Sequence, residues 1–221
     1  MPHNFCVMRS IGLLALLTTG VACGGGGDGA GSNGGGDKLE IGPPTIYTGF
    51  DGTNTYKAPI IAMTSAASAW TGGKVTWTFG DPSLVAAAPN DTGTQVMLTT
   101  KKAGMTTVTA SADGQTATAQ LVITAYTTAQ HTAGMDRYTK SQGSDPPCSS
   151  CHATGPDHTP TQIVVDTDDQ VMGSFVNGVD PEGKAIPAAK HTWTVTDPQK
   201  LGLVSYLRSL EPKGYPDPAD L

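Results

Sequence analysis

The chain has 221 residues, a net charge of −6 and only 14% charged residues. Its lysines and arginines form no cluster anywhere, which excludes the electrostatic footprint of a nucleic-acid-binding protein. The abundance of Gly and Pro excludes a fold dominated by long helices, while frequent Thr and Val favour β-structure over part of the chain.

The N-terminal segment predicts export from the cytoplasm. Residues 1–22 combine a weakly basic start, an apolar run from Ile11 to Leu17 and small residues at the end, which is typical of a signal peptide. The segment Gly20-Val21-Ala22-Cys23 resembles the lipobox of bacterial lipoproteins, although Gly20 stands where that motif usually has Leu. The resemblance implies lipidation of Cys23 and a membrane anchor. The alternative is an ordinary secretory signal with an unmodified cysteine.

A flexible tether is expected to follow the anchor. Residues 23–37 are almost entirely Gly, Asp, Ser and Asn after Cys23, and such a sequence cannot bury enough apolar surface to fold. A coil of this length reaches roughly 20 Å, which is enough to hold a folded domain clear of a membrane.

Residues 38–125 predict a β-sandwich. In the run 74–79, Val75, Trp77 and Phe79 share one face, so we expect Trp77 to lie in the core. Asp113-Gly114 predicts a hairpin turn between a β-branched run and the alternating run 116–123. Several short strands at this spacing predict a sandwich of two antiparallel sheets.

Parts of this segment resemble a known family. The stretches concerned are Val75-Thr76-Trp77 with Asp81-Pro82-Ser83-Leu84-Val85, and Lys102-Ala103-Gly104 with Thr107-Val108-Thr109-Ala110. They resemble the bacterial Ig-like domains of the second group, whereas residues 46–71 carry no clear motif. The resemblance implies a spacer or adhesion module without catalytic activity.

Three helices are predicted in residues 126–221. Residues 127–141 are compatible with a helix, and Thr167-Asp168-Asp169-Gln170 has the pattern of a capping box at the start of a second helix. Asp197-Pro198 predicts the N-cap and first residue of the last helix. Its apolar residues fall at helical spacing and form one stripe, made of Leu203, Tyr206, Leu207 and Leu210.

The segment Cys148-Ser149-Ser150-Cys151-His152 is the strongest chemical signal in the sequence. Its spacing is that of covalent c-type haem attachment, in which two thiols add to the vinyl groups of one porphyrin and the histidine binds the iron. We therefore expect Cys148, Cys151 and His152 to hold one covalent haem and its iron. Three alternatives remain open: a structural zinc site, a thioredoxin-like redox pair, and a disulfide between the two cysteines.

Residues 128–210 resemble the single-haem cytochromes c. Beyond the motif, Gly134 with Tyr138, and Tyr206-Leu207, resemble that family's contact between the first and last helices, in which a small residue lets an aromatic side chain pack closely. The Pro-rich segment 144–147 departs from the family pattern. The resemblance implies a multidomain fold class, with an all-β Ig-like sandwich at 38–125 followed by a small all-α cytochrome c domain at 126–221. The expected wall of the haem site is Val171, Met172, Phe175, Trp193, Leu203 and Leu207.

The second axial ligand of the iron is the open part of this prediction. In the cytochrome family that ligand lies just ahead of the last helix, and His191 occupies this place, so the resemblance implies iron bound by His152 and His191. The alternatives are Met172, His158, His131 or an open site. A histidine in place of methionine lowers the reduction potential.

These observations predict a membrane-tethered electron carrier rather than an enzyme. We expect an exported lipoprotein, periplasmic or at the cell surface and anchored in the outer membrane, that exchanges electrons with a redox partner protein. The alternative is a haem-containing sensor or adhesion module with an open sixth coordination site. A peroxidase is disfavoured because no carboxylate and arginine constellation accompanies the single Cys-x-x-Cys-His motif.

Overall fold

The computed structural model describes residues 37–152, 158–186 and 192–221. The predicted signal peptide, the lipidation site Cys23 and His191 lie outside the described residues, as does the predicted linker apart from Asp37. Residues 36–221 belong to one compact unit. Among the residues that the structure describes, no helix has the length and apolar character needed to cross a membrane.

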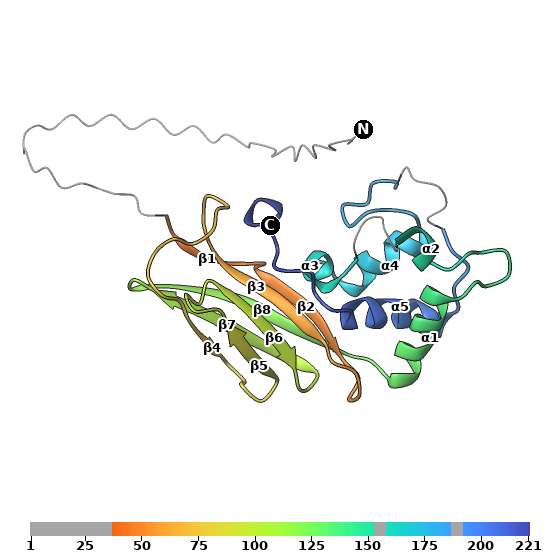
Figure 1. Ribbon diagram of the computed structural model, residues 1–221, viewed down its shortest axis with the longest axis horizontal. Helices are drawn as coiled ribbons and strands as arrows, with labels where there is room; N and C mark the ends of the chain where they lie inside the picture. Colours follow the sequence, from red (N-terminus) through yellow and green to blue (C-terminus); the bar gives the residue numbers. More distant parts are fainter. Residues whose placement is uncertain (1–36, 153–157, 187–191) are drawn as a thin grey trace, which may run out of the picture. The chain divides into compact units, whose positions relative to one another are not determined.

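Eight strands in the described part of the chain form two four-stranded sheets (Figure 1). The strand order of the first sheet is β1 (Leu39–Gly42), β3 (Lys57–Thr64), β6 (Gln95–Thr100) and β5 (Val85–Pro89). The strand order of the second sheet is β2 (Thr45–Phe50), β8 (Gln115–Ala125), β7 (Gly104–Ala112) and β4 (Thr76–Phe79).

These strand orders are those of an Ig-like sandwich. In that fold the first, second, fifth and fourth strands form one sheet, and the third, sixth and seventh form the other. Here β1, β3, β6 and β5 make the first set and β4, β7 and β8 the second, while β2 adds to the edge of β8. The predicted Ig-like sandwich is confirmed, with one correction: β2 runs parallel to β8, so the second sheet is mixed rather than antiparallel.

The sandwich core follows the predicted alternation of apolar residues. Leu121 and Ile123 of β8 are buried, and Asp113 and Gly114 both have positive φ, as the predicted hairpin turn requires. Trp77 is only partly buried, because β4 is an edge strand, and its Nε1 donates a hydrogen bond to the Gly93 carbonyl at 2.6 Å. The central strand β3, where the sequence carries no clear motif, is buried at seven of its eight residues.

The remaining chain forms short helices. They are α1 (Thr128–Thr139), α2 (Ser149–His152), α3 (Pro160–Ile163), α4 (Asp168–Val176), α5 (Asp197–Ser209) and the 3-10 turn η1 (Pro218–Asp220). The predicted capping box of α4 is confirmed, since the Thr167 hydroxyl accepts from the Gln170 amide and the Gln170 side chain accepts from the Thr167 amide. The N-cap of α5 is Thr196 rather than Asp197, because Gln199 completes a capping box with Thr196.

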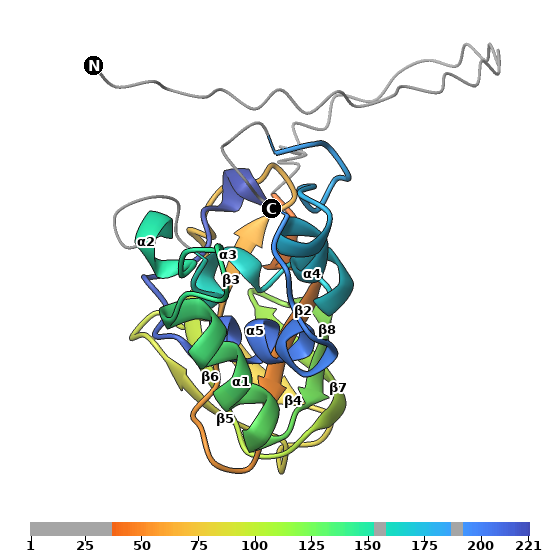
Figure 2. The ribbon, with the colours of Figure 1, turned by 90° about the vertical axis from the view of Figure 1, so that its right-hand side faces the viewer.

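The helices do not form a domain of their own, so the predicted multidomain fold class with a separate all-α cytochrome c domain is wrong. The helices lie to one side of the strands in Figure 1 and in front of them in Figure 2, which is viewed from that side, and Val164, which follows α3, is part of the sandwich core. The Tyr47 amide of β2 donates to the Val164 carbonyl at 2.8 Å. In the other direction, Tyr56 precedes β3 but packs in the helical core, where its hydroxyl lies 2.6 Å from the Ser205 hydroxyl.

The physical reason for this correction is the burial of α5. The predicted stripe is buried at Leu203 and Leu207, but Val204, Ser205 and Arg208 on other faces are also buried. A helix at the surface of a small domain would expose those positions to water. Here the additional faces contact the sandwich and the connection between α3 and α4.

Candidate functional site

The Cys-x-x-Cys-His motif forms the single helical turn α2. The amides of Cys151 and His152 both donate to the Cys148 carbonyl at 3.2 Å, which closes the turn. Cys148 is buried and Cys151 is exposed, and both are free thiols. Burial raises the pKa of the Cys148 thiol, and the nearby Arg137 charge opposes this effect. The turn therefore presents one thiol to the interior and one to solvent.

Cys148 and His152 open onto a cavity of about 330 Å³. Its wall combines side chains of α1, α3, α4 and α5 with the two segments that flank residues 187–191. The lining residues are Tyr138, Cys148, His152, His158, Gln162, Ile163, Asp166, Val171, Ser174, Phe175, Asp180, Pro181, Ile186, Trp193, Leu203 and Leu207.

Most of the predicted wall residues line this cavity. Val171, Phe175, Trp193, Leu203 and Leu207 all contribute to it. Met172 does not: it lies on the other side of α4, in a separate depression with Asp169 and Lys200. Ile163, Asp166, Asp180 and Ile186 were missed, because they come from a four-residue helix and from connecting segments that have no periodic pattern.

The candidate second ligands are dispersed. His131 is outside the cavity, buried at the α1–α5 contact, where its Nε2 lies 2.8 Å from the Ser209 hydroxyl. His158 lines the cavity, and its ring centroid is 4.3 Å from that of His152. His191 lies outside the described residues, but Ile186 and Trp193, on either side of segment 187–191, both line the cavity.

The predicted contact between the first and last helices is present. The backbones of α1 and α5 approach so closely that a Cβ on Gly134 would overlap the Gly202 carbonyl, and one on Gly202 would overlap the Gln130 carbonyl. Tyr206 of α5 packs against Tyr138 of α1, with 5.2 Å between the ring centroids. Because Tyr138 lines the cavity, this contact places the two helices around one side of it.

Trp193 is held in the wall by a buried arginine. The Arg137 guanidinium lies 5.0 Å from the centroid of the Trp193 ring, and it donates to the Pro146 carbonyl at 3.3 Å. The Trp193 amide donates to the Phe175 carbonyl at 3.0 Å, and the next amide, of Thr194, donates to the Asp145 carboxylate. The segment before α5 is therefore fixed to both α1 and α4.

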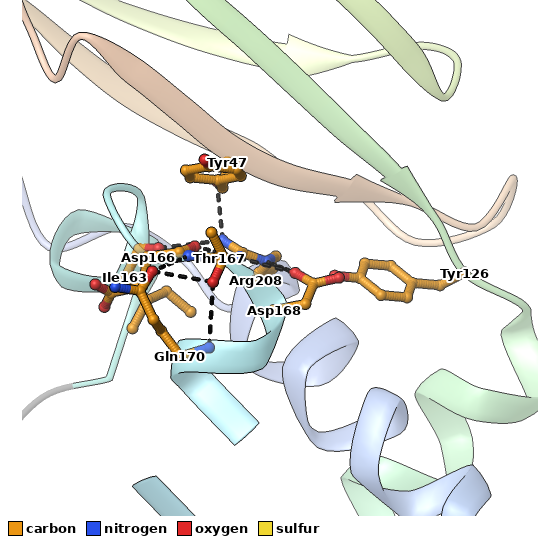
Figure 3. Close-up of polar contacts among 8 residues, drawn as sticks. All are labelled: Tyr47, Tyr126, Ile163, Asp166, Thr167, Asp168, Gln170 and Arg208. Atoms are coloured by element: carbon orange, nitrogen blue, oxygen red, sulfur yellow. Dashed lines mark hydrogen bonds and ion pairs between the residues drawn. The ribbon is translucent and has the colours of Figure 1, made fainter. Parts of the chain in front are cut away.

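A second buried arginine connects the cavity wall to the sandwich (Figure 3). Arg208 Nη1 donates to the carbonyls of Tyr47 in β2 and Ile163 in α3, at 2.9 and 3.1 Å. Its Nη2 donates to the Asp166 carbonyl at 2.7 Å. Its Nε and Nη2 both donate to Asp168 Oδ1, and Asp168 Oδ2 accepts from the Tyr126 hydroxyl at 2.8 Å. All five N–H groups of the guanidinium are thus used.

The cavity, Cys148 and His152 are compatible with the haem that the motif implies, whereas Cys151 is exposed and does not line the cavity. Cavities that bind cofactors are typically about 300–1,000 Å³, mostly apolar, with a few convergent polar groups. This cavity has such a lining, and a thiol and an imidazole from the motif converge on it. Within residues 37–152, 158–186 and 192–221, no three His, Cys, Asp or Glu side chains gather in a way that could hold a metal ion.

Comparison with known proteins gave no family assignment. No protein-family model matches the chain, and no curated protein matches it. Among solved structures it is similar to domains 4 and 5 of the S-layer protein SbsC, with 12% identity over 40% of this chain and 52% of that one and a TM-score of 0.31.

Two further similarities concern animal proteins. The cadherin-like domains 1 to 4 of zebrafish RET show 14% identity over 40% of this chain and 24% of that one, with a TM-score of 0.32. The tandem Ig domains of titin show 15% identity over 41% and 50%, with a TM-score of 0.29. The chain spans about half or less of each of these structures, and scores at this level carry no argument about its function.

Proposed function

We propose that this chain is an extracytoplasmic c-type cytochrome that carries one covalent haem and transfers electrons to or from a partner protein. The observation that carries the proposal is the position of the Cys148-x-x-Cys151-His152 turn beside an apolar cavity of about 330 Å³. Neither feature alone is sufficient, since a Cys-x-x-Cys pair also serves zinc sites and disulfides.

The chain's own residues have distinct roles in this proposal. Cys148 and Cys151 would hold the haem through thioether bonds, each made by adding the S–H of one thiol across one vinyl group, so that the attachment would need no oxidant. His152 would provide the imidazole ligand, and apolar side chains of α4 and α5 would form much of the wall beside it. When bound, the haem supplies an iron that gains or loses one electron. A mostly apolar wall would reduce the reorganisation of solvent that accompanies this change of charge.

His191 is proposed as the second axial ligand. Its position in the sequence, ahead of α5, supports this choice, and so does the fact that Ile186 and Trp193 on either side of its segment line the cavity. Met172 is disfavoured because its side chain lies in a different depression, beyond α4. The expected protein therefore has a lower reduction potential than one with a His/Met pair.

We also propose that the protein is an exported lipoprotein held at a membrane through Cys23, in the outer membrane of a two-membrane bacterium. The Gly-rich composition of residues 23–37 supports a tether, which would give the folded unit reach from the membrane. The sequence resemblance of residues 75–110 supports assigning the sandwich to the second bacterial Ig-like group.

The test is expression of the full chain in an exporting host that has the haem-attachment machinery. We expect the protein to keep haem after denaturation, and its reduced spectrum to show sharp bands that do not shift with carbon monoxide. The double variant Cys148→Ser with Cys151→Ser should lose covalent haem, whereas the control Ser149→Ala with Ser150→Ala, in the same turn, should keep it. Wild-type protein without covalent haem would contradict the proposal. It would favour a zinc site or a disulfide as the role of the two cysteines.

The same samples distinguish the alternatives. A reduced spectrum that shifts with carbon monoxide would mean an open sixth site and favour a sensor. His191→Ala should remove the low-spin spectrum, whereas Met172→Ala should leave it unchanged. An unchanged spectrum in His191→Ala would rule out His191 as the ligand and direct attention to His158.

A further inference from the structure

Asp166 is a carboxylate in the wall of an otherwise largely apolar cavity. It lies in the connection between α3 and α4, and the next lining residue is Ile163 on its N-terminal side and Val171 on its C-terminal side. Its main-chain carbonyl accepts a hydrogen bond from Arg208 Nη2 at 2.7 Å, which fixes the position of the residue. The side chain is half-buried. A charged group at this position is part of the cofactor's immediate environment.

The Asp166 carboxylate has no hydrogen-bond donor among the described residues, although a buried arginine is close to it. The guanidinium of Arg208 uses its five N–H groups on Asp168 and on three main-chain carbonyls. Its charge is already compensated by the ion pair with Asp168 at 2.9 Å. The Asp166 carboxylate is therefore the one group of this network for which residues 37–152, 158–186 and 192–221 provide no hydrogen-bond donor.

Several other charged and titratable groups lie near Asp166 or line the same cavity. Arg208 of α5 attracts its negative charge and Glu182 repels it. Asp180 lines the same cavity, and its Oδ1 accepts from the Lys184 amide at 2.7 Å. The remaining titratable groups in the wall are His152, His158, Tyr138 and Cys148.

These surroundings make the Asp166 carboxyl harder to ionise than an exposed one. Burial raises the pKa of its carboxyl to about 6, against the attraction of Arg208 and with the repulsion of Glu182. A carboxyl with such a pKa changes its charge close to neutral pH. A further negative charge inside the cavity would raise its pKa again, since like charges disfavour ionisation.

We propose that Asp166 takes up one proton from solvent when the cofactor of this cavity is reduced, and releases it on oxidation, so that the chain couples electron transfer to proton transfer. The inference rests on the proposed function, because it needs a redox centre in the cavity. The electron comes from the redox partner protein, the proton bonds to a carboxylate oxygen of Asp166, and the charge of the cavity is unchanged by the pair of events.

Thermodynamic linkage gives the sign and the upper limit of the change in midpoint potential with pH. If Asp166 binds a proton more tightly in the reduced protein, reduction is favoured at low pH, and the midpoint potential falls as pH rises between the two pKa values. With one proton per electron, the reduction equilibrium changes by at most tenfold per pH unit, which is about 59 mV for one electron.

The decisive experiment is a redox titration of the full-length haem-loaded protein between about pH 4.5 and 8.5, a range that spans the expected pKa values of the carboxyl. We expect the wild-type midpoint potential to fall with rising pH, with a slope approaching tenfold per unit above pH 6. Asp166→Asn, which keeps the shape but not the charge, should lose this slope. Asp180→Asn is the matched control in the same wall and should keep it. An unchanged slope in Asp166→Asn would overturn the inference while the proposed function stands.

A second measurement needs no variant to fold. Infrared difference spectra of the wild-type protein, reduced minus oxidised at pH 7, should show the carbonyl stretch of a newly protonated carboxyl, and this band should shift in deuterium oxide. Its absence would contradict proton uptake by any aspartate. Wild-type protein without covalent haem would overturn both the proposed function and this inference, and it would be recognised before any titration.

Discussion

Arg208 is a fully buried charge whose environment satisfies every donor. A buried ion pair is weak evidence for stability by itself, since desolvation offsets most of the attraction. Removing one partner is different, because it leaves the other partner buried and uncompensated. Here Asp168 and the carbonyls of Tyr47, Ile163 and Asp166 all depend on the same guanidinium.

We therefore expect Arg208→Met to lower the free energy of unfolding by about 3–5 kcal/mol. The matched control is Lys57→Met, which breaks the exposed ion pair with Glu211 and should cost less than about 1 kcal/mol. Urea unfolding followed by circular dichroism measures both. A loss of similar size in the two variants would show that the Arg208 network contributes nothing beyond a surface pair.

At the residue scale, a sequence pattern reveals functional residues that are close together in the chain, but it misses those that come together only through the tertiary fold. The Cys148 to His152 motif is readable because all its residues lie within one turn. Asp166 has no such signal, because its position in the cavity depends on Arg208, which is 42 residues further along the chain. The residues on either side of Asp166 and of Arg208 form no motif that would mark either one as part of a site.

At the scale of elements, the α1–α5 contact is determined by two glycines. Gly134 and Gly202 let the helix backbones touch, and no side chain can be placed between them without separating the helices. The sequence pointed to Gly134 through a family resemblance, but Gly202 was not singled out. Its role is visible only where the two helices meet.

Gly134→Ala should destabilise the protein by about 1–3 kcal/mol, because the new Cβ overlaps the Gly202 carbonyl and α1 must move away from α5. The control is Gly173→Ala in α4, where the new Cβ meets only Val179 Cγ2 at 3.4 Å. That change should be neutral or stabilising by up to about 1 kcal/mol, since Ala favours helix more than Gly does. Thermal unfolding compares them, and a tolerated Gly134→Ala would mean that the helices are not in close contact.

At the scale of the whole molecule, the sandwich is part of the site's support rather than a detached spacer. Strand β2 binds both the Val164 carbonyl and the Arg208 guanidinium, and Tyr56 fills the helical core. A chain that ends its sandwich at Ala125 and begins α1 at Thr128 has almost no linker between the two parts. The helices therefore depend on the strands for a large share of their buried contacts.

This arrangement predicts that a fragment of residues 126–221 will not unfold cooperatively, because Ser205, Arg208 and Val164 lose their partners in the sandwich. A fragment of residues 37–221 should unfold in one transition that includes both parts. Urea titration monitored by tryptophan fluorescence and by circular dichroism tests this. A fragment of residues 126–221 with a sharp transition of its own would restore the view that the helices are an independent domain.

The sequence alone determined the features that depend on neighbours in the chain. The alternating strands, the Asp113-Gly114 hairpin, the capping box of α4 and the Cys-x-x-Cys-His turn all arise from contacts over a few residues, and each appears in the structure. The tertiary structure decided what the helices pack against, which side chains line the cavity and where the buried charges lie. These depend on contacts between residues far apart in the chain, such as Tyr56 with Ser205 and Tyr47 with Arg208, and a periodic pattern records that a face is buried but not what buries it.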